Sequence, residues 1–231
     1  MESSELLDGE LECEIEAPCF QALSPDEVKL IKEGKTQIQF RRGENLTKQG
    51  GFAAYVMIIV KGLVKQYIED STGRNLNLQI LQPGDFIGLS AVFDNPVFQY
   101  STVAVTDTTV FMVDKQAMKT VLKNNGNFAF NIIMRYNEQS DILYSVLKTL
   151  TYKQMNGRLA DTLLYLNSLP YSDAETFGNL SRKDLADFAG ISTESTVKLL
   201  KTFEKEGIIS LNEKTIIIKN KSLLQEISKR G

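Results

Sequence analysis

The chain has 231 residues, of which 42% are hydrophobic, carries a formal net charge of −3 and contains no histidine. This length is enough for one large domain or two ordinary domains with a substantial core. Without histidine the chain lacks the most common general base, transition-metal ligand and haem ligand, which argues against an enzyme or a haem sensor built on those groups.

Neither a membrane segment nor a secretory signal stands out in the sequence. The longest apolar stretch, Ala53 to Val60, is far too short to cross a bilayer. No charged-then-apolar segment opens the chain, and two cysteines do not suggest a disulfide framework. We therefore expect a soluble, cytoplasmic protein with no membrane partner.

Residues 1–19 form an acidic leader. Seven acidic side chains and no basic one lie between Met1 and Glu16, a composition that favours a flexible, solvated tail. Cys13 and Cys19 lie at the end of this leader, and the neighbouring Glu12, Glu14 and Glu16 disfavour a reactive thiolate at Cys13. An iron–sulfur cluster generally needs four thiolates, and the chain has two. We expect no metal site, iron–sulfur cluster or haem, and an incidental or structural role for both cysteines.

The segment from about Leu23 to Phe111 has the pattern of an all-β domain. Short runs rich in Ile, Val, Phe, Tyr and Thr alternate with turn signals, among them Lys61-Gly62, Ser71-Thr72-Gly73-Arg74 and Pro83-Gly84-Asp85. This spacing predicts a small barrel or jelly roll. Such a domain either holds a small molecule in its mouth or serves as a packing body.

From Lys115 onward the hydrophobic pattern becomes helical. Six positions of one long helix, spaced alternately by four and three residues, form a heptad seam: Ile132, Tyr136, Gln139, Leu143, Val146 and Leu150. We predict that this seam packs on the same helix of a second chain and forms a dimer interface, in which the polar Gln139 helps to specify the register. Burial of the seam against the barrel of the same chain is the alternative.

Residues 180–201 have the pattern of two short helices separated at Gly190. Ser181 and Asp184 form a capping-box pattern before the first helix, Gly190 suits a left-handed turn, and Ser192 or Thr193 can cap the second helix. The inward face of the second helix carries Thr196, Leu199, Leu200 and Phe203, and the opposite face carries Thr193, Glu194, Val197, Lys198 and Lys201. Short polar and cationic groups on an exposed helix face fit a DNA major groove, so the pattern predicts a helix-turn-helix. A helical hairpin with a merely solvated face is the alternative.

A β-hairpin is predicted after Gly207. Polar Asn212-Glu213-Lys214 separates two short runs rich in β-branched residues, and a helix-turn-helix followed by such a hairpin is a winged helix. From Thr151 to the end the chain has 12 Lys and Arg against 10 Asp and Glu, a charge of +2, while the remainder carries −5. This asymmetry has the sign expected for a C-terminal nucleic-acid-binding part.

The order of these elements and three motifs resemble the cyclic-AMP receptor protein/fumarate–nitrate regulator (CRP/FNR) family of bacterial transcription factors. The motifs are Met57-Ile58-Ile59-Val60-Lys61-Gly62, Leu81-Gln82-Pro83-Gly84-Asp85-Phe86-Ile87-Gly88 and Gly190-Ile191-Ser192-Thr193-Glu194-Ser195, and the resemblance spans nearly the whole chain from Leu23. It implies an α+β fold with an N-terminal cyclic-nucleotide-binding-like β-roll (a double-stranded β-helix), a long dimerisation helix and a C-terminal winged helix-turn-helix. The expected ranges after the leader are 20–126, 127–150 and 151–231.

The resemblance also implies which residues contact DNA. Glu194 aligns with the family glutamate that accepts a hydrogen bond from a cytosine amino group, and Lys198 stands where the family usually has arginine. Thr193 stands where some members have a guanine-reading arginine, which argues for a different half-site, and Val197 can touch a thymine methyl group. Lys201, Arg182 and Ser181 are expected at backbone phosphates. The predicted DNA-binding set is Ser181, Arg182, Ser192, Thr193, Glu194, Val197, Lys198 and Lys201.

At the effector pocket the chain departs from the family pattern. Leu89 follows Gly88 where cyclic-nucleotide binders have glutamate, and Tyr100-Ser101 stands where they have Arg-Ser. Losing the phosphate clamp alone costs roughly 10- to 100-fold in affinity, so we expect an unidentified small-molecule effector other than cyclic AMP, or a vestigial pocket. On the long helix, Leu143 and Tyr144 replace the small hydroxylated residues that reach the purine. The expected pocket residues are Phe86, Gly88, Leu89, Ser90, Tyr100, Ser101, Leu143 and Tyr144.

The sequence therefore predicts a homodimeric, non-enzymatic transcriptional regulator that binds double-stranded DNA and, as the family does, RNA polymerase. We expect the hinge between its two parts near Leu150-Thr151-Tyr152. One alternative is a cyclic-nucleotide-binding signalling module that acts through protein contacts. A metal-dependent barrel enzyme of the cupin type is the other, and the missing histidines argue against it.

Overall fold

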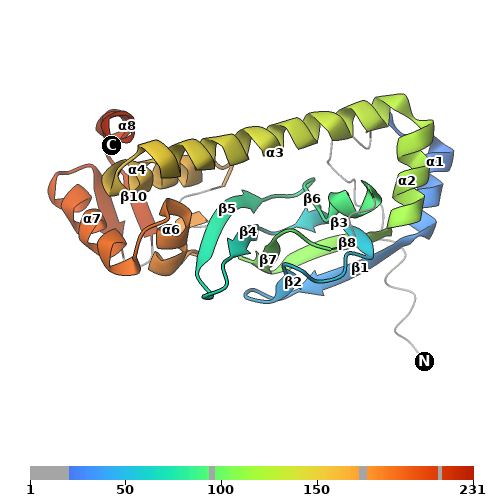
Figure 1. Ribbon diagram of the computed structural model, residues 1–231, viewed down its shortest axis with the longest axis horizontal. Helices are drawn as coiled ribbons and strands as arrows, with labels where there is room; N and C mark the ends of the chain where they lie inside the picture. Colours follow the sequence, from blue (N-terminus) through green and yellow to red (C-terminus); the bar gives the residue numbers. More distant parts are fainter. Residues whose placement is uncertain (1–20, 94–96, 172–175, 213–214) are drawn as a thin grey trace.

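The computed structural model describes residues 21–93, 97–171, 176–212 and 215–231. A β-roll lies beneath one long helix, and a small mostly helical domain lies at the far end of that helix (Figure 1). The acidic leader with Cys13 and Cys19 is outside the described residues. Within the described ranges, no helix combines the length and the apolar character needed to cross a membrane.

The β-roll consists of two antiparallel sheets. One has the strand order β1 (Lys35–Phe40), β8 (Thr108–Asp114), β3 (Tyr55–Lys61) and β6 (Phe86–Ile87). The other has the order β2 (Asn45–Thr47), β7 (Ser101–Ala104), β4 (Val64–Glu69) and β5 (Asn75–Leu81). Helix α1 (Pro25–Glu33) precedes the roll and starts at a capping box formed by Ser24 and Glu27. The predicted β-roll is confirmed.

The first family motif lies on β3, which is buried on both faces. Met57 and Ile59 pack between the sheets, while Val56 and Ile58 pack on the helices outside, which explains an unbroken apolar run in place of an alternating one. At the end of this motif Gly62 has φ 96°, and a Cβ there would lie 2.5 Å from the Asp107 carbonyl oxygen. The turn after β3 therefore requires glycine.

A short helix inside the roll and two helices after it complete the N-terminal part of the chain. A short 3₁₀ helix, η2 (Leu89–Phe93), follows β6, and α2 (Lys115–Asn124) starts at Asp114, whose side chain accepts hydrogen bonds from the backbone of Gln116 and Ala117. Helix α3 (Gly126–Tyr152) is capped by Asn125 and has 27 residues, which corresponds to about 40 Å. It runs along the whole length of the β-roll (Figure 1).

The C-terminal domain is a winged helix. Its elements are α4 (Met155–Asn167), α6 (Arg182–Ala189), α7 (Thr193–Lys205), β9 (Ile209–Asn212), β10 (Thr215–Ile218) and α8 (Lys221–Arg230). Strands β9 and β10 pair antiparallel, as the predicted hairpin requires, although its turn residues Glu213 and Lys214 lie outside the described residues. The apolar core includes Leu163, Leu200 and Phe203. The predicted α+β fold is confirmed.

The heptad seam predicted on the long helix faces the chain's own β-roll. Ile132 is 1% exposed inside the β-roll core, and Tyr136 packs on the same core. Gln139 lines a cavity toward β5, while Val146 and Leu150 line another cavity next to the second domain. Leu143 alone among the six is mainly exposed. A heptad pattern marks an apolar face without identifying what covers it, so the pairing of this stripe with a second chain stays a prediction.

A different stripe of α3 is exposed and apolar. It is offset from the predicted seam by about one residue and includes Tyr144, 69% exposed, and Leu147, 62% exposed. Toward the start of the helix the stripe continues with Phe130 and Ile133, both also mainly exposed. Four large apolar groups along one helix face are unusual for a surface in contact with water.

Candidate DNA interface

The helix-turn-helix has the local geometry that the sequence predicts. The Ser181 hydroxyl accepts a hydrogen bond from the Asp184 backbone N–H at 3.1 Å, and the Asp184 carboxylate accepts one from the Ser181 N–H at 2.8 Å. Gly190 ends α6 in the left-handed conformation, with φ 60°. Ser192, one of the two predicted caps, accepts from the Ser195 N–H and starts α7. These caps position α6 and α7 before any long-range contact forms.

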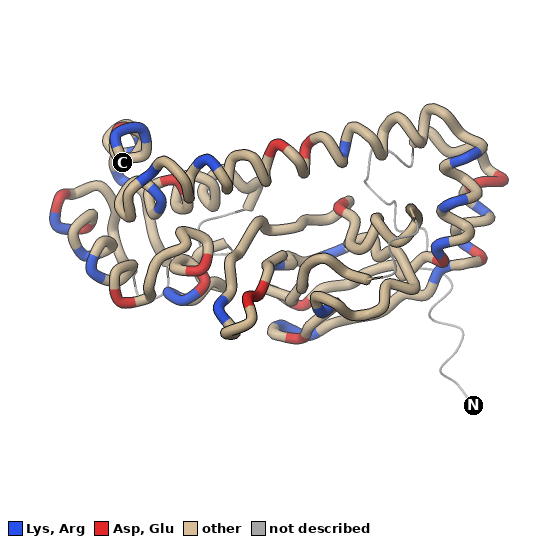
Figure 2. Tube along the Cα trace, in the orientation of Figure 1, with Lys and Arg blue, Asp and Glu red and all other residues tan. Residues whose placement is uncertain are grey.

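Helix α7 is buried on one side and exposed on the other. Thr196, Leu200 and Phe203 pack into the winged-helix core, and Leu199 is half-buried beside it. The opposite side brings together the five predicted DNA contacts of this helix, of which Thr193, Glu194, Lys198 and Lys201 are exposed and Val197 is half-buried. Figure 2 shows charges of both signs along α7 at the outer end of the molecule.

Two of the predicted base-reading groups are paired with each other. The Lys198 ammonium lies 2.7 Å from the Glu194 carboxylate, one helical turn away, and both side chains are well exposed. An exposed pair of this kind contributes only about 0.3–0.5 kcal/mol. Contact with bases can therefore replace it at little cost.

The predicted phosphate contacts on α6 lie elsewhere. Ser181 and Arg182 line a cavity of about 440 Å³ between the winged helix and the β-roll, together with Arg42 and Lys65. The Arg42 guanidinium donates a hydrogen bond to the Asn179 carbonyl across this cavity. The structure thus gathers the α7 residues on one open face and places the start of α6 against the sensor domain.

A second set of contacts holds α6 and α4 on the roll. Lys65 on β4 forms an ion pair with Asp184, and Asn77 on β5 donates to the Asp184 backbone carbonyl at 3.0 Å. The Ile80 N–H donates to the Tyr165 hydroxyl on α4 at 2.8 Å. The sequence does not single out these residues, because β4 and β5 carry other polar side chains, among them Gln66 and Gln79.

Asp184 makes this domain contact sensitive to acid. Burial raises the pKa of the Asp184 carboxyl, but hydrogen bonds from Lys65 and Ser181 outweigh burial and hold this pKa below its ordinary value. A group with a lowered pKa in the folded state stabilises the protein above its unfolded pKa of about 3.9, and this stabilisation is lost as the pH falls through the folded pKa.

We expect Asp184→Asn to lower the free energy of unfolding at pH 7 by roughly 1–3 kcal/mol, less than for a fully buried pair because both partners keep some exposure. The difference in the free energy of unfolding between the variant and the wild type should shrink below about pH 4. Urea unfolding over a pH series measures it. Asp187→Asn on the same helix is the control, because burial raises the pKa of Asp187 and the variant should change stability with the opposite sign. A difference for Asp184→Asn that did not vary with pH would contradict this account.

Two of the predicted effector residues of the roll are bonded to each other. The Gly88 N–H donates to the Tyr100 hydroxyl at 3.1 Å, and burial raises the pKa of this phenol. Phe86 and Leu89 are buried, Ser90 is half-buried in η2, and a Cβ on Gly88 would lie 2.6 Å from the Phe98 ring. The backbone donor next to the expected pocket is therefore already satisfied by a side chain of the same chain.

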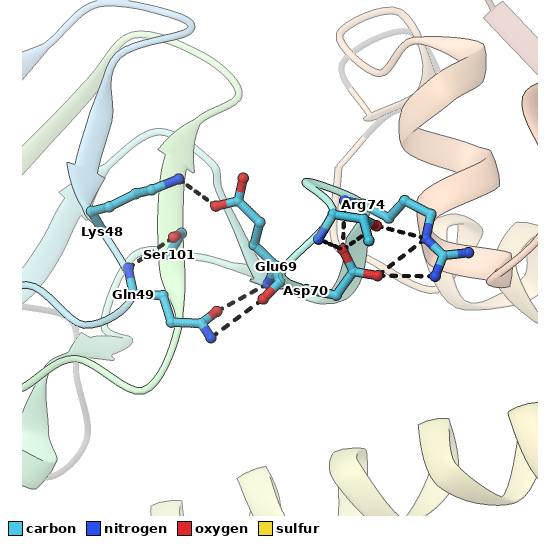
Figure 3. Close-up of polar contacts among 7 residues, drawn as sticks. Lys48, Gln49, Glu69, Asp70, Arg74 and Ser101 are labelled. Carbon is cyan, nitrogen blue, oxygen red and sulfur yellow. Dashed lines mark hydrogen bonds and ion pairs between the residues drawn. The ribbon is translucent and has the colours of Figure 1, made fainter.

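Ser101 also has a structural partner. Its hydroxyl accepts a hydrogen bond from the Gln49 N–H at 2.9 Å, and the Gln49 side chain bonds the backbone of Glu69 (Figure 3). The Lys48–Glu69 ion pair connects the same segments. Ser101 thus helps to join β7 to the segment after β2.

Leu143 and Tyr144 do not join this group. Both are mainly exposed on α3, so within one chain they do not complete the effector pocket. The resemblance placed them there by alignment, whereas the direction of a helix face depends on how the whole helix packs. In the part of the chain that the structure describes, no three His, Cys, Asp or Glu side chains gather as a metal site requires.

Comparisons with known proteins agree with this architecture. Residues 37–125 match the cyclic nucleotide-binding domain, and residues 157–227 match the Crp-like helix-turn-helix domain. The chain is 25% identical over 215 residues to the cyclic AMP receptor protein of Thermus thermophilus, a match that covers 92% of this chain and 97% of that protein. It is 27% identical over 177 residues to the cAMP-activated global transcriptional regulator CRP of Salmonella typhimurium, covering 75% and 84%.

A solved structure shares the fold. FixK2 from Bradyrhizobium japonicum superposes with a TM-score of 0.75 at 22% sequence identity, over 84% of this chain and 96% of that chain. Two domain matches in this order, separated by a long helix, agree with the relatives found along nearly the full length. The chain belongs to the CRP/FNR family of transcriptional regulators.

Proposed function

We propose that this protein is a homodimeric, sequence-specific DNA-binding regulator whose two α7 helices enter successive major grooves. The observation that carries the proposal is the exposed face of α7, where Glu194, Val197 and Lys198 are presented by a helix buried on its other side. Two-fold related readers of this type bind half-sites about 10 bp apart. Control of transcription through RNA polymerase follows the pattern of the family.

The dimer in this proposal forms through the exposed stripe of α3. Phe130, Ile133, Tyr144 and Leu147 follow spacings compatible with a heptad, and the exposed Asn137 lies between them as a polar position that can specify register. Two parallel copies of α3 would bury this apolar surface. They would also place both winged helices at the same end of the dimer.

The proposed regulation is a shift between two domain arrangements. In the present one, Arg182 faces the β-roll, and the Lys65–Asp184 pair holds the start of α6 there. Phosphate contacts by Ser181 and Arg182 would require this interface to open. An effector favours the open arrangement only by the difference in its affinity for the two states.

The effector we propose is not cyclic AMP. The chain has no carboxylate after Gly88 and no arginine before Ser101, and Tyr100 bonds the Gly88 N–H. A cyclic-nucleotide-binding module that signals through protein contacts is the competing function. Tight binding in titrations with cyclic AMP and cyclic GMP would favour that competing function.

Selection of bound sequences from a random duplex library, at a stated moderate salt concentration, tests the proposal directly. An enriched two-fold symmetric site with half-sites about one helical turn apart is the expected result. The same selection is made with the Asp184→Asn variant, in which the domain contact is loosened. The proposal would be contradicted if both proteins showed only weak, salt-sensitive retention of DNA without enrichment.

Two substitutions separate base reading from phosphate contact. We expect Glu194→Ala to lower the discrimination between base pairs at one position by about 1–3 kcal/mol, since the variant loses only a contact to a base edge. Lys201→Ala should instead weaken binding to all duplexes alike. The slope of the logarithm of the binding constant against the logarithm of the salt concentration should fall by about one, as for the loss of one phosphate contact. The affinity of each variant is measured for the selected site and for a random duplex. If the two variants had the same effect on the two duplexes, the separation of base reading from phosphate contact would be refuted.

A further inference from the structure

A cavity of about 550 Å³ lies where the two domains meet, between the second half of α3, strand β5 and the helices of the winged domain. It is a different space from the effector site expected inside the β-roll, because none of that site's predicted residues lines it. Its volume lies in the range of small-molecule sites. Strand β5 of the roll, the connecting helix α3 and the helices α4, α6 and α8 contribute to its wall.

The wall is mostly apolar and includes one unsatisfied polar atom. Ile142 and Val146 on α3 and Phe188 on α6 provide apolar surface. Asn77 on β5 also lines the cavity and is 0% exposed. Its amide nitrogen donates to the Asp184 carbonyl, whereas its Oδ1 has no hydrogen-bond partner among the described residues. A buried carbonyl oxygen without a donor is costly, so this atom favours a ligand that supplies an N–H or O–H.

The charge at the cavity is positive. Among the described residues of the lining Asp161 is the only carboxylate, and it is already engaged by Lys153 and by the hydroxyls of Thr149 and Ser228. Lys148 and Lys229 line the same cavity, are exposed, and form no ion pair with another described residue. Two unpaired cations beside an apolar wall attract an anionic group.

We propose that this cavity binds a small aromatic anion that carries a hydrogen-bond donor. Its ring system would contact Ile142, Val146 and Phe188, its donor would bond Asn77 Oδ1, and its anionic group would lie near Lys148 and Lys229. A ligand in this position touches both sides of the domain junction and would bias their arrangement. That regulatory consequence rests on the proposed function, whereas binding of the ligand does not.

The test uses the full chain without DNA and an anilinonaphthalene sulfonate as the probe, because this dye combines two aromatic systems, an N–H and a sulfonate. Saturable binding of one probe per chain, seen as increased fluorescence, is expected. Val146→Phe, which fills the cavity, should weaken binding at least about 10-fold, and Lys148→Ala combined with Lys229→Ala should weaken it about 5- to 10-fold. Lys123→Ala, an exposed lysine on α2 away from the cavity, is the matched control and should bind like the wild type.

A second arm changes the probe in place of the protein and so cannot fail through misfolding. The N-methyl derivative of the dye cannot donate to Asn77 Oδ1 and should bind roughly 3- to 10-fold more weakly than the parent dye. Equal affinity of both dyes, or equal binding to wild type and a folded Val146→Phe, would overturn the proposal. Because no DNA is present, either result is independent of whether the protein reads an operator.

Discussion

Replacing Leu147 by aspartate is expected to convert the proposed dimer into monomers and to weaken binding to a two-fold site at least about 100-fold. Leu147 lies toward the C-terminal end of the exposed apolar stripe of α3 and belongs to none of the buried core clusters of its own chain. In a dimer through this stripe, the new carboxylate would be buried without a partner, which costs several kcal/mol. A loss of about 2.7 kcal/mol already corresponds to 100-fold in affinity.

Sedimentation measures the oligomeric state of this variant, and titration of a symmetric duplex measures its affinity. Leu30→Asp is the matched control, since it makes the same change at an exposed leucine of α1 and should leave a dimer. Leu143→Asp discriminates between the two stripes of α3. Dissociation by Leu143→Asp without dissociation by Leu147→Asp would show that the seam predicted from the sequence, and not the exposed stripe, forms the interface.

Replacing Phe203 by alanine is expected to lower the free energy of unfolding by about 3–5 kcal/mol. Phe203 lies on the inward face of α7 and is 3% exposed in the winged-helix core. Its removal leaves a cavity beneath α7, on the buried side of the helix that carries the proposed base contacts on its exposed side. We therefore expect loss of DNA binding to follow loss of folded protein as the temperature rises.

Urea unfolding measures the stability loss, and duplex binding at low and high temperature measures its consequence. Thr202→Ala is the neighbouring control, because Thr202 is exposed on the same helix and should change stability by no more than about 0.5 kcal/mol. Normal stability of Phe203→Ala together with lost DNA binding would contradict the packing role and would point to a direct contact instead.

The helix-turn-helix could be predicted almost residue by residue because its signals are local. Ser181 with Asp184, the left-handed Gly190 and the cap Ser192 each act within four residues of their partners, and the 3.6-residue period alone separates the two faces of α7. The same holds for the glycine turn at the end of β3, which needs a positive φ whatever the rest of the chain does.

Which face of α3 is buried depended on the tertiary structure. The helix carries two apolar stripes, and its sequence ranks neither above the other. Phe128 and Ile132 enter the core that the β-roll shares with α1 and α2, and this rotation leaves Tyr144 and Leu147 outside. Neighbouring residues of a helix point about 100° apart, so a shift of one residue brings a different face of α3 onto the β-roll. The stripe that stays free for a partner therefore depends on how α3 packs on the roll.

The domain contact likewise had no local signal. Lys65 and Asp184 are 119 residues apart, and the cavity at the domain junction exists only where β5, α3 and the winged helix meet. By itself the sequence determined the order of the domains, the caps and turns, and the exposed face of α7, because short-range hydrogen bonds and periodicity specify these features. Only the tertiary structure decided the exposed stripe of α3, the Lys65–Asp184 contact and the cavity at the domain junction, because each depends on surfaces brought together from distant parts of the chain.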